Sequence, residues 1–205
     1  MSEFIQKVPL YYNGEDEVFG ELYKGFPIHF LEYWRNNWKP SLENYILQDK
    51  KRPEHYHWSW SRKVMNALIN GQEDSFFWID FDSATQGIML TEQNTSYFGN
   101  DLGKRNIYIA FLEAAPWNCY KDKTTGYYAS VGIMLLMAAI QYSESLGLDG
   151  RIALESLPQS EGFYLKHKMI PVERPDCNST LMYFELTTQN AREFLRGLKN
   201  ETNEP

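Results

Sequence analysis

The chain has 205 residues, of which 43% are hydrophobic and 16% are aromatic, and its formal net charge is −7. This length and composition suit one folded domain with a sizeable core and argue against extensive disorder. The acidic balance argues against a broad electrostatic contact with nucleic acid or with an anionic membrane surface, but it leaves room for a small basic pocket that binds one phosphorylated ligand.

Targeting signals and metal motifs are not evident in the sequence. The first twenty residues contain no basic segment followed by an apolar core, so we expect no secretory signal. No apolar run approaches the roughly 20 residues of a membrane span. Cys119 and Cys177 stand alone, without the spacing of metal ligands. We therefore expect a reduced, cytoplasmic protein that holds no metal and does not bind a membrane.

The first part of the chain predicts a hairpin followed by helices. Residues 1–25 are rich in Tyr, Phe and Gly, and Asn13-Gly14 is a typical hairpin turn. Apolar residues at helical spacing over 27–48 predict a helix, which Pro40 should break into two. A further helix is predicted over 58–70, with Gly71 as its end.

The remaining elements alternate between strands and helices. We expect strands over 76–81 and 87–90, a polar loop over 91–105, and a central strand over 107–115 that is apolar on both faces. Later elements are a helix over 131–146, a strand over 152–157, a helix over 159–167, a strand over 181–186 and a terminal helix over 191–198 capped by Thr188. This order predicts an α/β (α+β) domain with a mixed sheet.

The start of the 131–146 helix has the features of an anion site. Its first residues include the small side chains of Ala129, Ser130 and Gly132, which would let a ligand approach the backbone. A helix N-terminus offers unpaired N–H groups and a partial positive charge, both of which favour phosphate. Many helices begin in this way, so these residues alone are a weak signal.

In its context this stretch resembles the GNAT superfamily of acyl-CoA-dependent N-acyltransferases. The phosphate loop of that family reads Arg/Gln-x-x-Gly-x-Gly/Ala and is followed by Leu-Leu; here the register gives Tyr127, Ser130, Gly132 and Leu135-Leu136. The family's tyrosine, at the end of the next helix, matches Tyr164. The resemblance covers about residues 75–186. Tyr127 and Ser130 depart from the motif and make the phosphate loop degenerate, and the loop over 116–130 is longer than the family usually has.

The resemblance implies a GNAT-like twisted mixed sheet flanked by helices and splayed where the cofactor enters. We expect a single domain over 1–200, with N-terminal helical and hairpin elements over 1–74, an acyl-CoA-binding core over 75–200 and a disordered tail over 201–205. Acetyl-CoA or another acyl-CoA would be the co-substrate. Its pantetheine arm would pair with the backbone of Ala114 and Ala115, and its pyrophosphate would bind amides of Ala129, Ser130, Val131, Gly132 and Ile133. The thioester would lie between the ends of the 107–115 and 152–157 strands.

Two side chains are the catalytic candidates. By the resemblance, Tyr164 is the general acid that protonates the departing thiolate, and the alternative is a core aromatic residue. Glu113 lies near the end of the central strand and could take a proton from the attacking ammonium. Its alternative role is a salt bridge. Glu155, on the neighbouring strand, is a second candidate for the base.

Other polar and aromatic residues carry weaker signals. Trp117 and Asn118 follow the central strand and should border the acceptor pocket, unless they pack the inserted loop. His55 and His57 lack a third metal ligand, and Asp80 and Asp82 lie at a predicted turn, where Asp is common. The tryptophans at 34, 38, 58 and 60 could line a pocket for an aromatic acceptor, although such residues more often form core.

The sequence therefore predicts an N-acyltransferase that transfers an acetyl or other short acyl group from acyl-CoA to a primary amine by direct attack. The acceptor would be a small molecule or a peptide. An alternative is a catalytically inactive GNAT-like binding or interaction module, and a third reading is an enzyme that acylates aminoacyl-tRNA, against which the acidic charge argues. The oligomeric state stays open and includes a homodimer.

Overall fold

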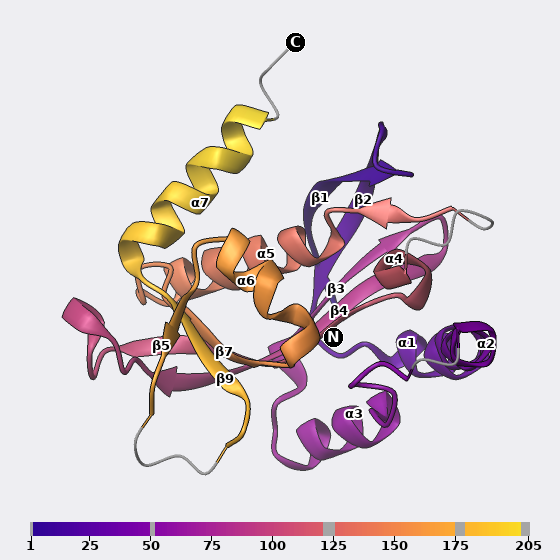
Figure 1. Cartoon of the computed structure of the whole chain (residues 1–205), viewed down its shortest axis with the longest axis horizontal. Helices are drawn as coiled ribbons and strands as arrows, with labels where there is room; N and C mark the ends of the chain where they lie inside the picture. The colour runs from indigo at the N-terminus through magenta and orange to yellow at the C-terminus, as the bar shows by residue number, and fades with distance from the viewer. Residues whose placement is uncertain (1, 50–51, 121–125, 175–178, 202–205) are drawn as a thin grey trace. The chain divides into compact units, whose positions relative to one another are not determined.

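The computed structural model describes residues 2–49, 52–120, 126–174 and 179–201 (Figure 1). Cys177, part of the inserted loop after Pro116 and most of the expected tail lie outside these residues. The described strands form a sheet in the order β6-β1-β2-β3-β4-β5-β7-β9-β8. Their bounds are β1 Glu3–Tyr12, β2 Asp16–Lys24, β3 Phe76–Phe81, β4 Ala84–Thr95, β5 Arg105–Ala114, β6 Tyr128–Ala129, β7 Ile152–Ser156, β8 Ile170–Val172 and β9 Met182–Leu186.

The sheet is mixed, as the sequence predicts. β5 and β7 pair in parallel, with Ile107 opposite Ile152 and Ile109 opposite Leu154. Antiparallel pairing joins β1 to β2, β2 to β3, β3 to β4, β7 to β9 and β8 to β9. The α-helices are α1 Ile28–Tyr33, α2 Lys39–Asp49, α3 Trp60–Ile69, α4 Pro116–Tyr120, α5 Val131–Ser145, α6 Glu161–Lys166 and α7 Thr188–Glu201. No helix among the described residues is both long and apolar enough to cross a membrane.

The chain divides into two compact units. Unit 1 contains residues 1–90 and 111–135, and unit 2 contains residues 91–110 and 136–205. Unit 1 begins with the predicted hairpin. Asn13 (φ 50°) and Gly14 (φ 84°) both adopt left-handed backbone conformations between β1 and β2, as a tight hairpin turn requires.

The helices of unit 1 differ from the prediction at Pro40. The backbone does not break there; it changes to a π-helical turn over Trp34–Trp38 and then continues as α2, with Pro40 in its first turn. The N–H of Lys39 bonds to the C=O of Trp34, five residues back. A proline ring clashes with the carbonyl four residues before it in a regular helix, and the wider turn is a way to accommodate it.

Helix α3 and glycine 87 shape the interior of unit 1. The hydroxyl of Ser59 caps α3 by accepting the N–H of Arg62 at 3.4 Å, and the helix buries Trp60, among others, against the unit's core. Gly87, on β4, lets the start of α5 come close. A methyl group added at this position would lie 2.4 Å from Cγ1 of Val131.

Two expectations for unit 2 need correction. The loop expected over 91–105 is shorter and covers 96–104, since β4 runs to Thr95 and β5 begins at Arg105; the polar side chains at the end of β4 report an exposed strand face rather than an irregular backbone. The cap of α7 is Thr187, not Thr188. The Thr187 hydroxyl accepts the N–H of Asn190 at 3.2 Å, whereas Thr188 is already the first helical residue.

Candidate functional site

The end of β5 places a carboxyl group in the interior of unit 1. The side chain of Glu113 is only 6% exposed. Its Oε2 accepts a hydrogen bond of 2.6 Å from Nε1 of Trp60, which is itself fully buried on α3. Its Oε1 lies 3.7 Å from Nε2 of His55. The predicted base is therefore held by an indole and an imidazole.

Burial controls the charge of these groups. It raises the pKa of Glu113 to about 7, although the Trp60 hydrogen bond and the positive charge of Lys63 act in the opposite direction. Burial also lowers the pKa of His55, which favours a neutral imidazole. The contact between His55 and Glu113 is thus a polar contact rather than a salt bridge. A carboxyl group with a pKa near 7 suits a general base at neutral pH.

A lysine and two further aromatic rings complete this region. Nζ of Lys63 lies 3.0 Å from the ring centroid of Phe111 and 4.3 Å from that of Trp58. Burial lowers the pKa of Lys63 to about 8, and the negative charge of Glu113 limits that effect. We call the six residues Glu113, His55, Trp58, Trp60, Lys63 and Phe111 the Glu113 cluster.

Sequence reasoning found Glu113 but not its contacts with α3 and with the segment before α3. Trp60 and Glu113 are 53 residues apart, and nothing local in either segment marks them as partners. The helical register of α3 does place Trp60 and Lys63 one turn apart, so that pair could have been expected on one side of the helix. Two of the four tryptophans considered above, Trp38 and Trp60, are buried core residues.

The start of α5 has the geometry of an anion site. Ser130 has a φ of 73°, in the left-handed region, and its C=O accepts the first helical hydrogen bond from the N–H of Met134 at 2.9 Å. The amides of residues 131–133 precede that bond and so have no acceptor within the helix. No acidic side chain lies in the first turn. These amides could hold a phosphate group.

Tyr127, which aligns with the Arg or Gln of the GNAT phosphate-loop motif, is hydrogen-bonded to the β1–β2 turn. The hydroxyl of Tyr127 donates to the C=O of Asn13 at 2.9 Å. The N–H of Asn13 donates in turn to the C=O of Tyr127 at 2.8 Å. Tyr127 therefore holds the segment before α5 against the hairpin, which is a structural role.

The two alanines predicted to pair with pantetheine are not equivalent. The N–H of Ala115 donates to the C=O of Gln86 at 2.8 Å, and its C=O accepts the N–H of Asn118 at 2.9 Å. Both backbone groups of Ala115 are thus used within unit 1. Because backbone groups alternate along a strand, those of Ala114 face the other edge of β5. The C=O of Ala114 accepts the thiol of Cys119 at 3.4 Å, so the N–H of Ala114 is the better candidate for pairing with a cofactor.

Trp117 and Asn118 both bind the buried side chain of Gln86. Nε1 of Trp117 donates to Oε1 of Gln86 at 3.0 Å, and Nδ2 of Asn118 donates to the same oxygen at 3.0 Å. Oδ1 of Asn118 accepts the N–H of Tyr128, at the start of β6, at 2.7 Å. These bonds favour the alternative that the two residues pack the inserted loop.

In unit 2, Tyr164 lies on α6 and is 7% exposed. Its ring contacts those of Phe163 and Phe184, with centroid distances of 5.2 Å and 5.9 Å. Burial raises the pKa of Tyr164 to about 12, so the hydroxyl keeps its proton at neutral pH, as a general acid must. Glu155 pairs with Arg174 and accepts from the hydroxyl of Ser179 at 2.9 Å, which favours a structural role.

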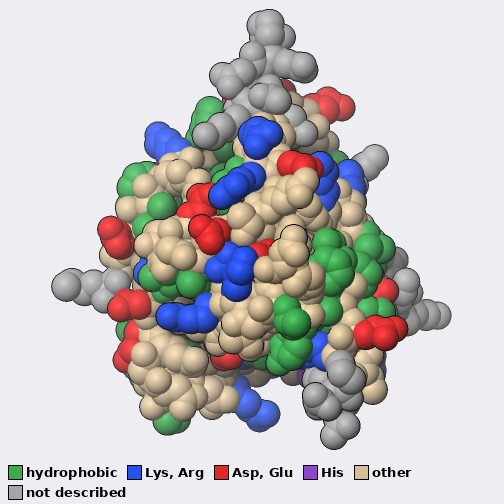
Figure 2. All heavy atoms as spheres, turned by 90° about the vertical axis from the view of Figure 1, so that its left-hand side faces the viewer, with side chains coloured by type: hydrophobic (Ala, Val, Ile, Leu, Met, Phe, Trp, Pro, Cys, Tyr) green, Lys and Arg blue, Asp and Glu red, His purple; other side chains and the backbone are tan. Residues whose placement is uncertain are grey.

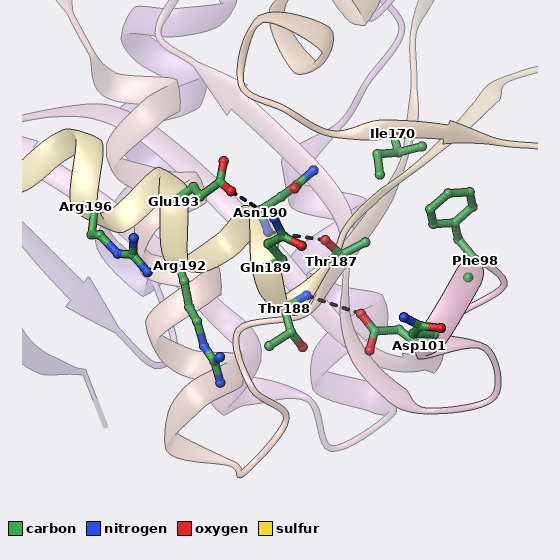
Figure 3. Close-up of a pocket in the computed structure, with 12 residues that line it drawn as sticks. Phe98, Asp101, Ile170, Thr187, Thr188, Gln189, Asn190, Arg192, Glu193 and Arg196 are labelled. Atoms are coloured by element: carbon green, nitrogen blue, oxygen red, sulfur yellow. Dashed lines mark hydrogen bonds between the residues drawn. The ribbon is translucent and has the colours of Figure 1, made fainter.

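The described residues offer no metal centre, and none of the predicted site residues lines the polar cavity at the start of α7 in unit 2. Within the described ranges no group of three or more His, Cys, Asp or Glu side chains could hold a metal. A polar cavity of about 770 Å³ lies at the start of α7, beside Asp101, Asn190 and Arg192 (Figure 3). Oδ2 of Asp101 accepts the N–H of Thr188 there at 3.2 Å, which stabilises the helix start.

Comparison with known proteins bears on the fold. No protein-family profile matches the chain, and no curated protein matches its sequence. Solved structures do match. The N-acetyltransferase YlbP of Bacillus subtilis, in complex with coenzyme A, has a TM-score of 0.52 at 14% identity, over 82% of this chain and 95% of that one. The PaiA N-acetyltransferase of Thermoplasma acidophilum, in complex with coenzyme A, has a TM-score of 0.51 at 18% identity, over 81% and 97%.

A third match is an acetyltransferase of the GNAT family from Listeria monocytogenes, with a TM-score of 0.52 at 11% identity, over 88% of this chain and 99% of that one. The mixed sheet with flanking helices and these matches, which cover most of the chain, show that it has the GNAT fold. The resemblance stated from the sequence is confirmed at the level of the fold.

Proposed function

We propose that the chain is an N-acyltransferase that transfers an acetyl or other short acyl group from acyl-CoA to a primary amine. The observation that carries this proposal is the buried carboxyl group of Glu113, whose pKa of about 7 suits a base that accepts a proton from an ammonium group. Burying an acidic group without a full charge partner lowers stability, and such costs are concentrated at functional sites.

The start of α5 is our proposed binding site for the pyrophosphate of the coenzyme. Ala129, Ser130, Val131, Gly132 and Ile133 would supply backbone amides, and Gly132 has no side chain to obstruct a phosphate. Ala114 would pair with the pantetheine arm. Coenzyme A is present in the matched YlbP and PaiA structures, which supports the same ligand class here.

The reaction would be a direct transfer. The uncharged amine attacks the thioester carbonyl, a C–N bond forms and the C–S bond breaks. The amine proton passes to Glu113, directly or through water, and the departing thiolate takes the hydroxyl proton of Tyr164. No covalent enzyme intermediate is needed, and we assign Cys119 no role as a nucleophile. The acceptor is a small molecule or a peptide.

Calorimetric titration with acetyl-CoA tests the cofactor site. We expect micromolar binding by the wild-type chain and by Tyr164→Phe, and its loss in Gly132→Glu, because the new carboxylate would repel phosphate. Gly197→Glu is the matched control. Gly197 is also helical, and open space surrounds it, so this variant should bind normally. If acetyl-CoA, longer acyl-CoAs and free coenzyme A all fail to bind, the enzyme proposal is wrong.

A GNAT-fold interaction module is the second candidate. The structural roles of Tyr127, Trp117 and Asn118 favour it, because positions where catalytic relatives could bind ligands are here used to hold the fold together. Acyl-CoA binding without transfer to any amine would support it. Acylation of aminoacyl-tRNA gains no support from the face seen in Figure 2, where basic and acidic side chains both lie.

A further inference from the structure

The Glu113 cluster already contains a primary amine, which belongs to the chain itself. Lys63 extends from α3 and places Nζ 3.0 Å from the ring centroid of Phe111 and 4.3 Å from that of Trp58. Aromatic faces attract ammonium groups in this arrangement. The same helix supplies Trp60, whose indole binds the carboxyl group of Glu113.

The position of this amine relative to the strand suggests access to an acyl group. Phe111 and Glu113 are two residues apart on β5 and so share one face of that strand, separated by about 7 Å along it. Nζ of Lys63 lies over the ring of Phe111. Ala114, where we propose that the pantetheine arm pairs, is the next residue after Glu113. The long flexible lysine side chain can move over such distances.

The chemistry of Lys63 also differs from that of an exposed lysine. Burial lowers its pKa from the ordinary value of 10.5 to about 8. At pH 7 about a tenth of such an amine is uncharged, against about three parts in ten thousand for an ordinary lysine. Only the uncharged amine attacks a thioester. The negative charge of the Glu113 carboxylate interacts with Lys63. The same carboxylate could accept the proton that the reaction releases.

We propose that Lys63 is a modification site, at which the chain acylates its own ε-amine from bound acyl-CoA. This inference rests on the proposed function. The uncharged Nζ attacks the thioester carbonyl, a C–N amide bond forms, the C–S bond breaks, the amine proton passes to Glu113, and coenzyme A leaves as a thiolate that takes a proton from water. The products are acyl-Lys63 and free coenzyme A.

Acylation would change the site in which it occurs. It removes the positive charge of Lys63. In the unmodified chain that charge lowers the pKa of Glu113. The carboxyl group would therefore hold its proton more tightly after modification and act less readily as a base at pH 7. Self-acylation is thus also a form of self-inhibition.

Peptide mass spectrometry of the full chain incubated with acetyl-CoA tests the proposal. The measured quantity is the rate of acetylation at Lys63 relative to Lys39, which is an exposed lysine on α2. We expect Lys63 to react at least about tenfold faster than Lys39, at a rate independent of protein concentration, because the bound thioester is held beside it. In Gly132→Glu the rate at Lys63 should fall by at least about tenfold while the rate at Lys39 stays unchanged, because only Lys63 depends on the bound thioester, and Gly197→Glu should behave as the wild type.

The outcomes separate this inference from the proposed function. Equal rates at Lys63 and Lys39 in the wild-type chain, or a rate at Lys63 that Gly132→Glu leaves unchanged, would overturn the inference. If acetyl-CoA binds and external amines are acylated while Lys63 stays unmodified, only the inference fails. If acetyl-CoA does not bind at all, both fail. Lys63→Arg, which keeps the positive charge but is not acylated, confirms the assignment of the modified peptide.

Discussion

Replacing Glu113 with Gln should make the chain more stable above neutral pH. The amide oxygen can still accept the indole hydrogen bond of Trp60, so the substitution removes the ionisation but keeps the contact. In the wild-type chain burial raises the pKa of Glu113 from 4.5 to about 7. The folded chain therefore holds this proton more tightly than the unfolded chain does.

The size and sign of the effect follow from that difference. The contribution of Glu113 to stability is fully present below pH 4.5 and is lost as the pH rises through 7, because the unfolded chain gives up the proton first. At about 1.4 kcal/mol per pKa unit, the difference of 2.5 between 4.5 and about 7 amounts to about 3 kcal/mol. The Glu113→Gln chain does not lose this stability as the pH rises, because its side chain does not ionise.

Urea unfolding followed by tryptophan fluorescence between pH 4 and pH 8 measures the effect. The free energy of unfolding of Glu113→Gln minus that of the wild type should rise by about 3 kcal/mol across this range. Taking the difference cancels the contributions of His55 and other groups that titrate in both chains. Glu32→Gln, which makes the same chemical change at an exposed position on α1, is the control. A difference that does not vary with pH would refute the buried, proton-holding state of Glu113.

Three further substitutions test other parts of the molecule. Tyr164→Phe should lower kcat for acyl transfer by about 10²–10⁴-fold without changing acetyl-CoA affinity, and a kcat within about twofold of the wild type would contradict its role as the acid. Ser130→Gly should raise the free energy of unfolding by about 1 kcal/mol, because glycine adopts a φ of 73° without strain; a loss of stability in urea would count against that reasoning. Gln86→Ala should lower it by about 1–3 kcal/mol, since it leaves Trp117 and Asn118 without their shared acceptor, and an unchanged urea midpoint would show that these bonds contribute little.

Local signals in the sequence predicted much of the fold. Asn13-Gly14 marks a turn because both residues tolerate a left-handed backbone, and the structure places them there. The α5 helix and its end at Gly147, whose φ is 71°, follow from apolar spacing and from the same property of glycine. The GNAT resemblance rested on the order of such elements, which is why it held at low sequence identity.

The partners within the site could not be predicted, because they depend on contacts distant in sequence. The indole of Trp60 and the carboxyl group of Glu113 meet only when α3 packs on β5. The short strand β6 exists because Tyr11 and Tyr12 of β1 pair with it, and two residues carry no periodicity of their own. The polar residues 91–95 were misread as part of the loop that follows them, because side-chain polarity reports exposure, whereas strand pairing is set by the neighbouring strand.

The close approach at Gly87 has a consequence for anyone who scans this chain by mutation. Any side chain at position 87 would displace the first residues of α5, since even a methyl group would lie 2.4 Å from Val131. A substitution in the middle of a strand would thereby disturb the amides proposed to bind the coenzyme, although position 87 is not among the residues proposed to bind it. A screen scored on coenzyme affinity should therefore flag Gly87 as strongly as Gly132, and only a structure explains why.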